Sequence, residues 1–358
     1  MKNKHTQTRL TCKRLAANIC ATALLLSMAL FSCCAKGTKS AQQTEKISIV
    51  CTTFPQYDWV KNIIAGNEDK FSVALLMNKG SDLHNYQPAA QDMVRIASSD
   101  LFIHIGGNSD VWVKDSLKEA TNKNMVVINL LETLGSGAKL AETVEGMQDE
   151  HHHDEDCDDE HDHEEHERVY EEHSDHARHN HTDEHVWLSL RNAEIFVSKI
   201  AEAVADLDSA NKDAYKANAE KYTAQLKELD AEYTKAVSAS TRKTIVFGDR
   251  FPFRYLVDDY GLEYFAAFSG CSAESEASFE TIAFLADKVS SLNLPAVLTI
   301  EKSDRKIAQS IIANAGGSKA EVLELDSMQS VTSKDIEAGV NYIDVMKKNL
   351  GVLKKALN

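Results

Sequence analysis

The sequence predicts an α/β protein of two lobes, each built on a mostly parallel four-stranded sheet, with a long helix between them. The chain has 358 residues, which accommodates two domains of about 150 residues beside processed and low-complexity segments. Two further observations support this fold class. Short β-branched runs alternate with helical patterns on both sides of a charged segment, and one uninterrupted helical pattern separates the two sets of runs.

The β-branched runs define four strands in each lobe. Each run is bounded by turn residues and precedes a segment, such as 89–99 or 305–315, in which apolar residues recur three or four positions apart. This alternation is typical of βαβ units and therefore of parallel sheets. The expected strands lie within 46–54, 71–77, 101–106 and 125–130 in the first lobe, and within 244–248, 263–268, 296–301 and 321–326 in the second.

A single rigid helix is expected between the lobes. Glycine and proline are absent from 212 to 237, and the apolar residues form one helical face: Tyr215, Tyr222, Leu226, Leu229, Tyr233 and Val237. At 1.5 Å per residue this helix would be about 39 Å long, enough to run along both lobes. We therefore expect an N-terminal lobe at 46–210, a linking helix at 211–240 and a C-terminal lobe at 241–358. A coiled-coil or partner-binding helix is the alternative.

The first 32 residues have the pattern of a lipoprotein signal peptide. Residues 1–14 are basic without any acid, an apolar stretch runs from Leu15 to Phe31, and Ser32-Cys33 follows. The boundary resembles a bacterial lipobox, which implies cleavage before Cys33, lipidation of its thiol and a tether at 33–45. Ordinary secretion and an uncleaved anchor are the alternatives. Each version places the rest of the chain outside the cytoplasm, on a bacterial membrane or in the periplasm.

One segment concentrates the acidity and the histidines of the chain. The formal net charge is −16, and residues 149–185 alone contain 17 Asp and Glu, two Arg and 11 of the 14 histidines. Imidazoles bind Zn, Cu and Ni, and a segment with almost no apolar residues has nothing to bury. We interpret 149–182 as a disordered loop with many weak metal sites, with a solvated charge run as the alternative. The negative charge argues against a nucleic-acid partner.

The cysteines do not form a disulfide framework. Beyond the signal peptide and the anchor, only Cys51, Cys157 and Cys271 remain. Buried or free thiols are the favoured interpretation, and a Cys51–Cys271 disulfide across the lobes is the alternative.

Candidate ligands follow the ends of the expected strands, where open α/β sheets bind their ligands. His84 follows the second strand, His185 follows the acidic segment, and Asp249 and Asp326 follow strands of the second lobe. Each has another explanation, such as a helix cap for an aspartate. Glu301 closes the seventh strand; a cap in the segment that follows it is the favoured interpretation, and a role of Glu301 as a ligand is the alternative. His104 lies within an apolar strand, and we expect it to be a core residue.

These residues lie in motifs of a known family. GSDLHNYQP (80–88) resembles G-x-x-x-H-x-Y-x-P, and DEHVWLSLRNA (183–193) resembles D-P-H-x-W-L-x-P-x-N-A, of the zinc and manganese ABC-transporter substrate-binding proteins. Residues 101–113, 296–308 and 341–357 are similar to further segments of that family. The resemblance implies two Rossmann-like lobes joined by a long rigid helix, a metal bound between them, and delivery to a membrane permease with a cytoplasmic ATPase. We expect a monomer.

The resemblance carries over only part of the metal site. His84 and His185 match the first two ligands of the family, and Asp326 matches an acidic ligand of its manganese-type members. The position of the third ligand is Gly248, which has no side chain to donate. Asp249, a histidine of the loop or water is expected to replace it.

The sequence therefore predicts high-affinity capture of Zn²⁺ outside the cytoplasm and delivery to an ABC importer, not catalysis. The chain contains no H-E-x-x-H or G-x-S-x-G motif of a hydrolase. Zinc is favoured because the histidine-rich loop resembles that of the zinc-specific members. A manganese receptor of the same family, and a histidine-rich surface metal sink or adhesin without a transporter, are the alternatives. Since histidine binds metal in its neutral form, affinity is expected to fall below about pH 6.5.

Overall fold

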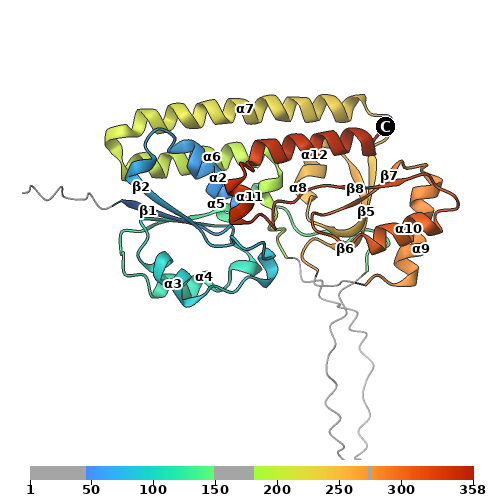
Figure 1. The fold of residues 1–358 in the computed structure, drawn as a ribbon, viewed down its shortest axis with the longest axis horizontal. Coiled ribbons are helices and arrows are strands. Elements are labelled where there is room, and N and C mark those ends of the chain that lie inside the picture. The colour runs from blue at the N-terminus through green and yellow to red at the C-terminus, as the bar shows by residue number, and fades with distance from the viewer. Residues whose placement is uncertain (1–45, 149–180, 273–275) are drawn as a thin grey trace, which may run out of the picture. The chain divides into compact units, whose positions relative to one another are not determined.

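The computed structural model describes residues 46–148, 181–272 and 276–358 (Figure 1). The predicted signal peptide, the tether with Cys33 and residues 149–180 of the predicted loop lie outside these ranges. Residues Lys46–Asn358 form a single unit. In the described part of the chain, no helix is both long and apolar enough to cross a membrane.

Two four-stranded sheets, parallel throughout, confirm the predicted fold class. The first has the order β2-β1-β3-β4 and the second the order β6-β5-β7-β8. Two strands run past their predicted ends, β5 by three residues and β6 by one. The strands are β1 (Ile47–Cys51), β2 (Phe71–Leu75), β3 (Leu101–His104), β4 (Val126–Asn129), β5 (Thr244–Phe251), β6 (Glu263–Ser269), β7 (Ala296–Thr299) and β8 (Glu321–Glu324).

Helices cover both faces of each sheet, which explains why the central strands are apolar at consecutive positions. In β1, Ile49 belongs to a core shared with α2 (Phe54–Ile63), whereas Val50 belongs to a core on the opposite face, with Ile96 of α3 (Ala90–Ala97). Figure 1 shows α3 below this sheet and α2 above it. The other helices of this lobe are α4 (Val113–Lys118), α5 (Leu130–Leu134) and α6 (Leu190–Leu207).

The second sheet is covered in the same way. Val246 packs with the apolar side chains of α9 (Phe279–Ser291) and α10 (Lys306–Asn314), whereas Phe247 points into the core shared with the first lobe. One core therefore extends through both lobes, and smaller cores lie on the outer faces of the sheets. Two short helices complete the lobe, α8 (Arg254–Tyr260) and α11 (Ser333–Glu337).

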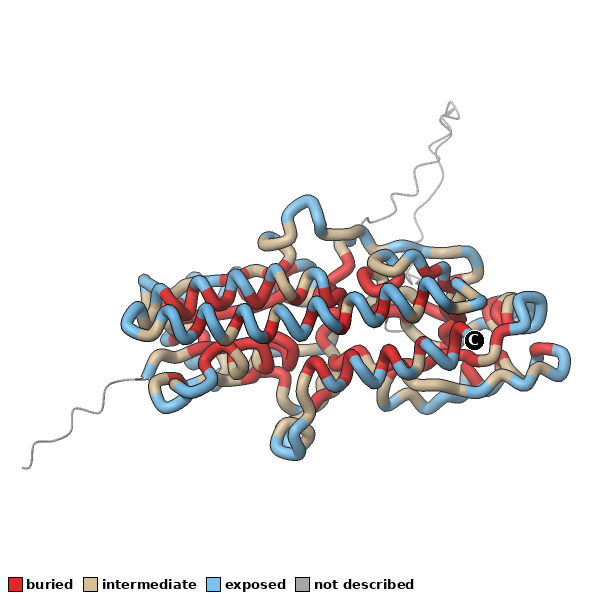
Figure 2. Tube along the Cα trace, turned by 90° about the horizontal axis from the view of Figure 1, so that it is seen from above, coloured by how far each residue is buried: buried red, intermediate tan, exposed pale blue. Residues whose placement is uncertain are grey.

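The linking helix is α7 (Lys212–Ala239), 28 residues long and therefore about 42 Å in length. The face predicted to be apolar is buried. Figure 2, seen from above, shows how buried and exposed positions alternate along the helices on that side of the molecule. The helix contacts α2 and α6 in the first lobe and α8 in the second. Tyr222 Oη donates a hydrogen bond to Asp58 Oδ2 (3.0 Å), and Tyr233 Oη donates one to the carbonyl of Met346 (2.6 Å).

The C-terminal helix α12 (Tyr342–Ala356) is a second connection between the lobes. It contacts α2 of the first lobe, β7 and β8 of the second, and α7 beside it (Figure 1). Its first residue, Tyr342, is fully buried and donates a hydrogen bond from Oη to the carbonyl of Trp187 (2.6 Å). Two helices packed along a continuous core restrict hinge motion between the lobes.

Candidate metal centre

His84 lies on a short 3₁₀ turn, Leu83–Asn85, in the loop after β2. Asp82 caps this turn, because its Oδ1 accepts a hydrogen bond from the backbone N–H of His84 (2.9 Å). The other oxygen of Asp82 pairs with Arg250 Nη2 of the second lobe (2.8 Å). Burial raises the pKa of Asp82, but Arg250 and the hydrogen bond from His84 outweigh burial and hold that pKa below its usual value. The turn that presents His84 is thus fixed from both lobes.

His185 precedes another 3₁₀ turn, Val186–Leu188, and is fully buried. Asp183 Oδ1 accepts hydrogen bonds from the backbone N–H of His185 (2.8 Å) and from its ring Nδ1 (3.0 Å). Since a carboxylate only accepts, Nδ1 carries the proton and the lone pair of Nε2 is left for a metal. The hydroxyl of Tyr255 donates to the carbonyl of Asp183 (2.9 Å) and holds this segment against α8.

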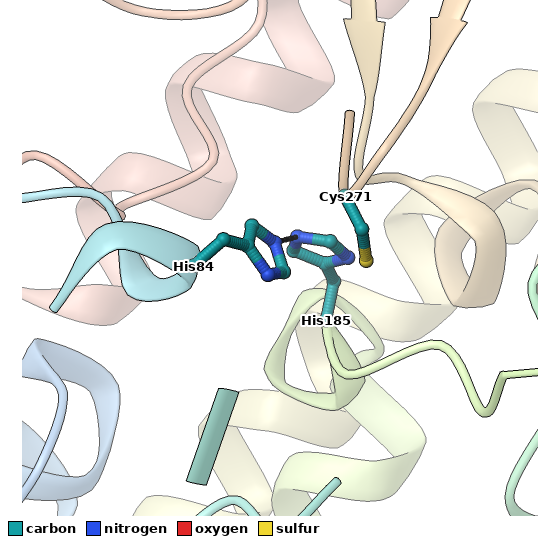
Figure 3. Close-up of side chains that lie close together, drawn as sticks. All are labelled: His84, His185 and Cys271. Atoms are coloured by element: carbon teal, nitrogen blue, oxygen red, sulfur yellow. Dashed lines mark hydrogen bonds between the residues drawn. The ribbon is translucent and has the colours of Figure 1, made fainter. Parts of the chain in front are cut away.

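The two histidines face one another through their Nε2 atoms, which are 3.3 Å apart (Figure 3). Two imidazole nitrogens at 2.0–2.1 Å from a tetrahedral zinc ion would be separated by about 3.3 Å. Burial, followed by the neighbouring charge of His185, lowers the pKa of His84 to about 4. His84 is therefore neutral at pH 7, the form that binds a metal.

The far side of the His84 ring is held by Ser109 and Glu184. Nδ1 of His84 is 2.7 Å from Ser109 Oγ and 3.7 Å from Glu184 Oε2. Glu184 Oε1 in turn accepts a hydrogen bond from the backbone N–H of Ser109 (3.0 Å). Burial raises the pKa of Glu184, against the hydrogen bonds from Ser109 that lower it. Polar groups behind a ligating histidine orient its ring and increase its basicity.

Cys271 is the third side chain of this cluster (Figure 3). One potential ligand atom from each of His84, His185 and Cys271 lies within 4.8 Å of the others. Cys271 comes two residues after the end of β6. Like the other candidates it follows the end of a strand, but a cysteine in that place also indicates a plain thiol or a disulfide partner, the two interpretations given above. The alternative disulfide is not formed, because Cys51 is an unpaired, buried thiol.

The two predicted carboxylates lie outside this cluster. Asp249 Oδ1 accepts a hydrogen bond from the backbone N–H of Arg250 (2.8 Å), and Asp326 Oδ1 accepts one from that of Met328 (2.8 Å). Burial, and then the charge of Glu301, raise the pKa of Asp326 to about 6. Asp249 lines a cavity of about 440 Å³ together with Asp82 and Arg250. Their role as metal ligands stays a prediction.

Glu301 has a structural task. Its carboxylate accepts hydrogen bonds from the backbone N–H groups of Ser327 (2.7 Å), Gln329 (3.0 Å) and Ser330 (3.2 Å), and from the hydroxyls of both serines. Glu301 therefore fixes the loop that follows Asp326. The sequence did not indicate this role.

His104 is a core residue, as predicted. It is 6% exposed, and its Nδ1 lies 3.2 Å from Oδ2 of Asp110. The same oxygen accepts hydrogen bonds from the backbone N–H groups of Ile105 and Gly106, each at 2.8 Å. Asp110 thus organises the turn after β3.

Two glycines explain how the site is shaped. A Cβ at Gly248 would lie 2.5 Å from Cα of Ala308 in α10, so β5 has no room for any side chain at this position. A Cβ at Gly270 would lie 3.0 Å from Cε1 of His185 and 2.7 Å from the carbonyl oxygen of Phe251. Glycine at 270 therefore allows the end of β6 to approach the buried imidazole.

The described residues on both sides of the histidine-rich segment are anchored near this site. Before the segment, the backbone N–H of Gln148 donates to the carbonyl of Ala267 in β6 (3.0 Å). After it, the backbone N–H of Ala141 donates to the carbonyl of His181 (2.7 Å). The described chain therefore stops beside β6 at Gln148 and resumes at His181, four residues before His185.

Comparison with known proteins identifies the family. A family model described as zinc-uptake complex component A, periplasmic, matches residues 49–356. The chain belongs to the zinc-uptake component A family. This match spans both lobes, the linking helix and all three side chains of the cluster.

Relatives in this family are named for zinc. The chain is 31% identical over 310 residues to the zinc-binding protein AdcA of Streptococcus pyogenes, a match that covers 86% of this chain but 56% of AdcA. It is 29% identical to the high-affinity zinc uptake system protein ZnuA of Bacillus subtilis, over 95% of this chain and 96% of ZnuA. The Zn(II)-bound ZnuA-like domain of Streptococcus pneumoniae AdcA is 26% identical, with a TM-score of 0.64 over 87% of this chain and 99% of that domain.

Proposed function

We propose that this chain captures Zn²⁺ outside the cytoplasm and delivers it to an ABC importer. The metal binds between the lobes, with His84 and His185 as ligands through their Nε2 atoms. The permease and ATPase of the importer are its partners.

The convergence of the two histidines carries this proposal. Their Nε2 atoms are 3.3 Å apart, the separation that a shared tetrahedral ion requires. Each ring has a polar partner on Nδ1, Ser109 for His84 and Asp183 for His185. Metal-binding histidines usually have such a partner on the nitrogen that faces away from the ion. The two partners support a built metal site rather than an accidental contact between two buried imidazoles.

The histidine-rich loop supports zinc as the cargo. Its imidazoles suit zinc, copper and nickel better than manganese, which prefers oxygen ligands. We propose that the loop holds ions weakly and raises their concentration beside His185, because the chain returns from the loop only a few residues before this ligand.

A lipid anchor at Cys33 would keep the receptor beside its permease. The signal-peptide pattern of residues 1–32 supports this anchor, and one relative, from Streptococcus pneumoniae, is named a zinc-binding lipoprotein. A Cys33→Ala variant should be released from the membrane fraction and should not incorporate labelled fatty acid.

Zinc titration against a competing chelator tests the metal site. The chain from Ala35 onward is suitable, since the described unit begins at Lys46. We expect one tight site that survives deletion of 149–180 and is lost in His84→Ala and His185→Ala. His181→Ala is the matched control and should keep the tight site. Loss of all tight binding on loop deletion would show that the cleft is not the site.

Growth in zinc-depleted medium tests delivery. A strain that lacks its own copy should grow with the wild-type chain and fail to grow with His84→Ala. Equal rescue by both chains would refute the proposed role in import.

A further inference from the structure

We propose that Cys271 is the third ligand of the transported metal, so that the centre is a His₂Cys site with a thiolate. This inference rests on the proposed function and specifies its metal preference. Zinc and other thiophilic divalent ions would be retained, and manganese, magnesium and calcium would be rejected.

The geometry of the cluster supports a shared ion. Potential ligand atoms of His84, His185 and Cys271 lie within 4.8 Å of one another. In a tetrahedral centre with Zn–S of 2.3 Å and Zn–N of 2.0–2.1 Å, sulfur and nitrogen would be about 3.6 Å apart. The difference is at most about 1.2 Å, which rotation of a cysteine side chain can supply. Figure 3 shows the cysteine beside the buried imidazole of His185, with His84 on the other side of that ring.

The packing of β5 explains why the third ligand comes from a different strand. The third ligand of the resembled family would fall on Gly248, where a Cβ would lie 2.5 Å from Cα and 2.8 Å from N of Ala308. These are backbone atoms of a helix and cannot rotate away. A ligand at this position is therefore excluded by α10.

The neighbouring strand supplies a substitute at the same edge of the sheet. β5 and β6 are parallel and paired, so their carboxyl ends lie side by side. Cys271 follows β6, and Gly270 before it leaves the space that the His185 ring occupies. The site thus has no side chain at 248 on β5 and instead a thiol at 271, just after the neighbouring strand β6.

The chemistry of the donor set determines the preference. Thiolate is a soft ligand that selects zinc over manganese, magnesium and calcium, which favour oxygen. On binding, the Cys271 sulfur forms a bond to the ion and its proton passes to solvent, without any change in oxidation state. Three protein ligands leave a fourth position for water, or for one of the predicted carboxylates, Asp249 or Asp326.

Cobalt(II) is the probe that tests this assignment, because a thiolate ligand gives a near-ultraviolet sulfur-to-cobalt charge-transfer band. The chain from Ala35 carries Cys157→Ser, so that Cys51 and Cys271 are the only thiols beyond residue 34. We expect the band in this chain and its loss in Cys271→Ser. Zinc affinity should fall by about 100-fold or more, since even changes behind a ligand cost 10–100-fold.

Two further variants sharpen the result. Cys51→Ala is the matched control and should keep the band, because Cys51 is buried in β1, outside the cluster. Cys271→Asp replaces sulfur by oxygen and should reduce the ratio of zinc to manganese affinity by about 10-fold or more. Circular dichroism of each variant tests whether it is folded.

The outcomes separate this inference from the proposed function. Two results together would overturn the role of Cys271 and leave zinc capture intact: a cobalt complex without the charge-transfer band, and tight zinc binding that needs His84 but survives Cys271→Ser. Absence of any tight site in the wild-type chain would overturn the proposed function itself.

Discussion

Adding a side chain at Gly248 should destabilise the protein rather than complete the metal site. In Gly248→Ala, the new Cβ would lie 2.5 Å from Cα, 2.8 Å from Cβ and 2.8 Å from N of Ala308. To reach an ordinary contact of about 3.5 Å, α10 must move by roughly 1 Å away from the sheet. Overpacking of a core costs typically 1–3 kcal/mol, and contact with a helix backbone argues for the upper end, about 3 kcal/mol.

The backbone entropy of glycine partly offsets this cost. Replacing glycine by alanine within a strand contributes roughly 0.5–1 kcal/mol of stability. The net expectation is a loss of about 2 kcal/mol in the free energy of unfolding, measured by urea denaturation followed by circular dichroism. Gly248→His should lose more and should not bind zinc more tightly, because its side chain cannot enter the site.

Gly351→Ala is the matched control for this prediction. Gly351 lies within α12 and its φ is not positive. Apart from its chain neighbours and the nearby backbone of its own helix, no atom lies within 4 Å of the place that a Cβ would take. Alanine there should be neutral or stabilise by up to about 1 kcal/mol. If Gly248→Ala were as stable as the wild type, or if Gly248→His raised zinc affinity, α10 would not exclude a ligand from β5.

Three other predictions concern neighbouring features. Gly270→Ala should weaken zinc binding by about 10-fold in a chelator competition, since its Cβ would press on the ring of His185; an unchanged affinity would contradict the close approach. Burial raises the pKa of Asp58 to about 6, so the folded protein holds the proton of this carboxyl more tightly than the unfolded chain does. The free energy of unfolding of the wild type should therefore decline as the pH rises from about 4 to 6. Asp58→Asn can still accept the hydrogen bond from the Tyr222 hydroxyl. It should abolish that decline and be more stable than the wild type at pH 7 by up to about 3 kcal/mol; parallel pH profiles of the two proteins in urea unfolding would refute this. Glu301→Ala should lower the free energy of unfolding by about 3 kcal/mol or more, because three backbone donors, partly buried, lose the same acceptor; a Tm within one degree or so of the wild type would argue against its anchoring role.

The structure changes the pH dependence that we expect for metal binding. An unperturbed histidine predicts weaker binding below about pH 6.5. Burial and the adjacent His185 lower the pKa of His84 to about 4, so protonation of this ligand competes with zinc only at a more acidic pH. The shift depends on which groups surround the ring, and no local sequence pattern reports that.

The fold was predictable because its signals are local and repeated. Each of the eight strands is a short apolar run with turn residues at its ends, and α7 carries an apolar face from Tyr215 to Val237, about six turns. Hydrophobic periodicity of this kind reports directly on which face of an element is buried. The end of β5 was missed because Asp249 and Arg250 are polar, and pairing with β6 rather than hydrophobicity extends the strand there.

The metal centre was predictable only in part. His84 and His185 stand in recognisable motifs past the ends of secondary structure, and their approach to 3.3 Å agrees with that expectation. Cys271 carried a weaker signal, a cysteine after a strand, which has several meanings in a sequence. Its meeting with two histidines from distant parts of the chain depends on how the two lobes pack, not on any spacing along the sequence.

The sequence by itself determined the two parallel sheets, the linking helix and the two histidines, since periodicity and short motifs encode local structure and local chemistry. The tertiary structure decided the rest of the site. It showed that α10 occupies the space beside Gly248, that the end of β6 brings a thiol to the histidines, and that Glu301 anchors a loop. Each of these depends on contacts between segments far apart in the chain, where the close packing of side chains against backbone, rather than residue type, determines which groups can meet.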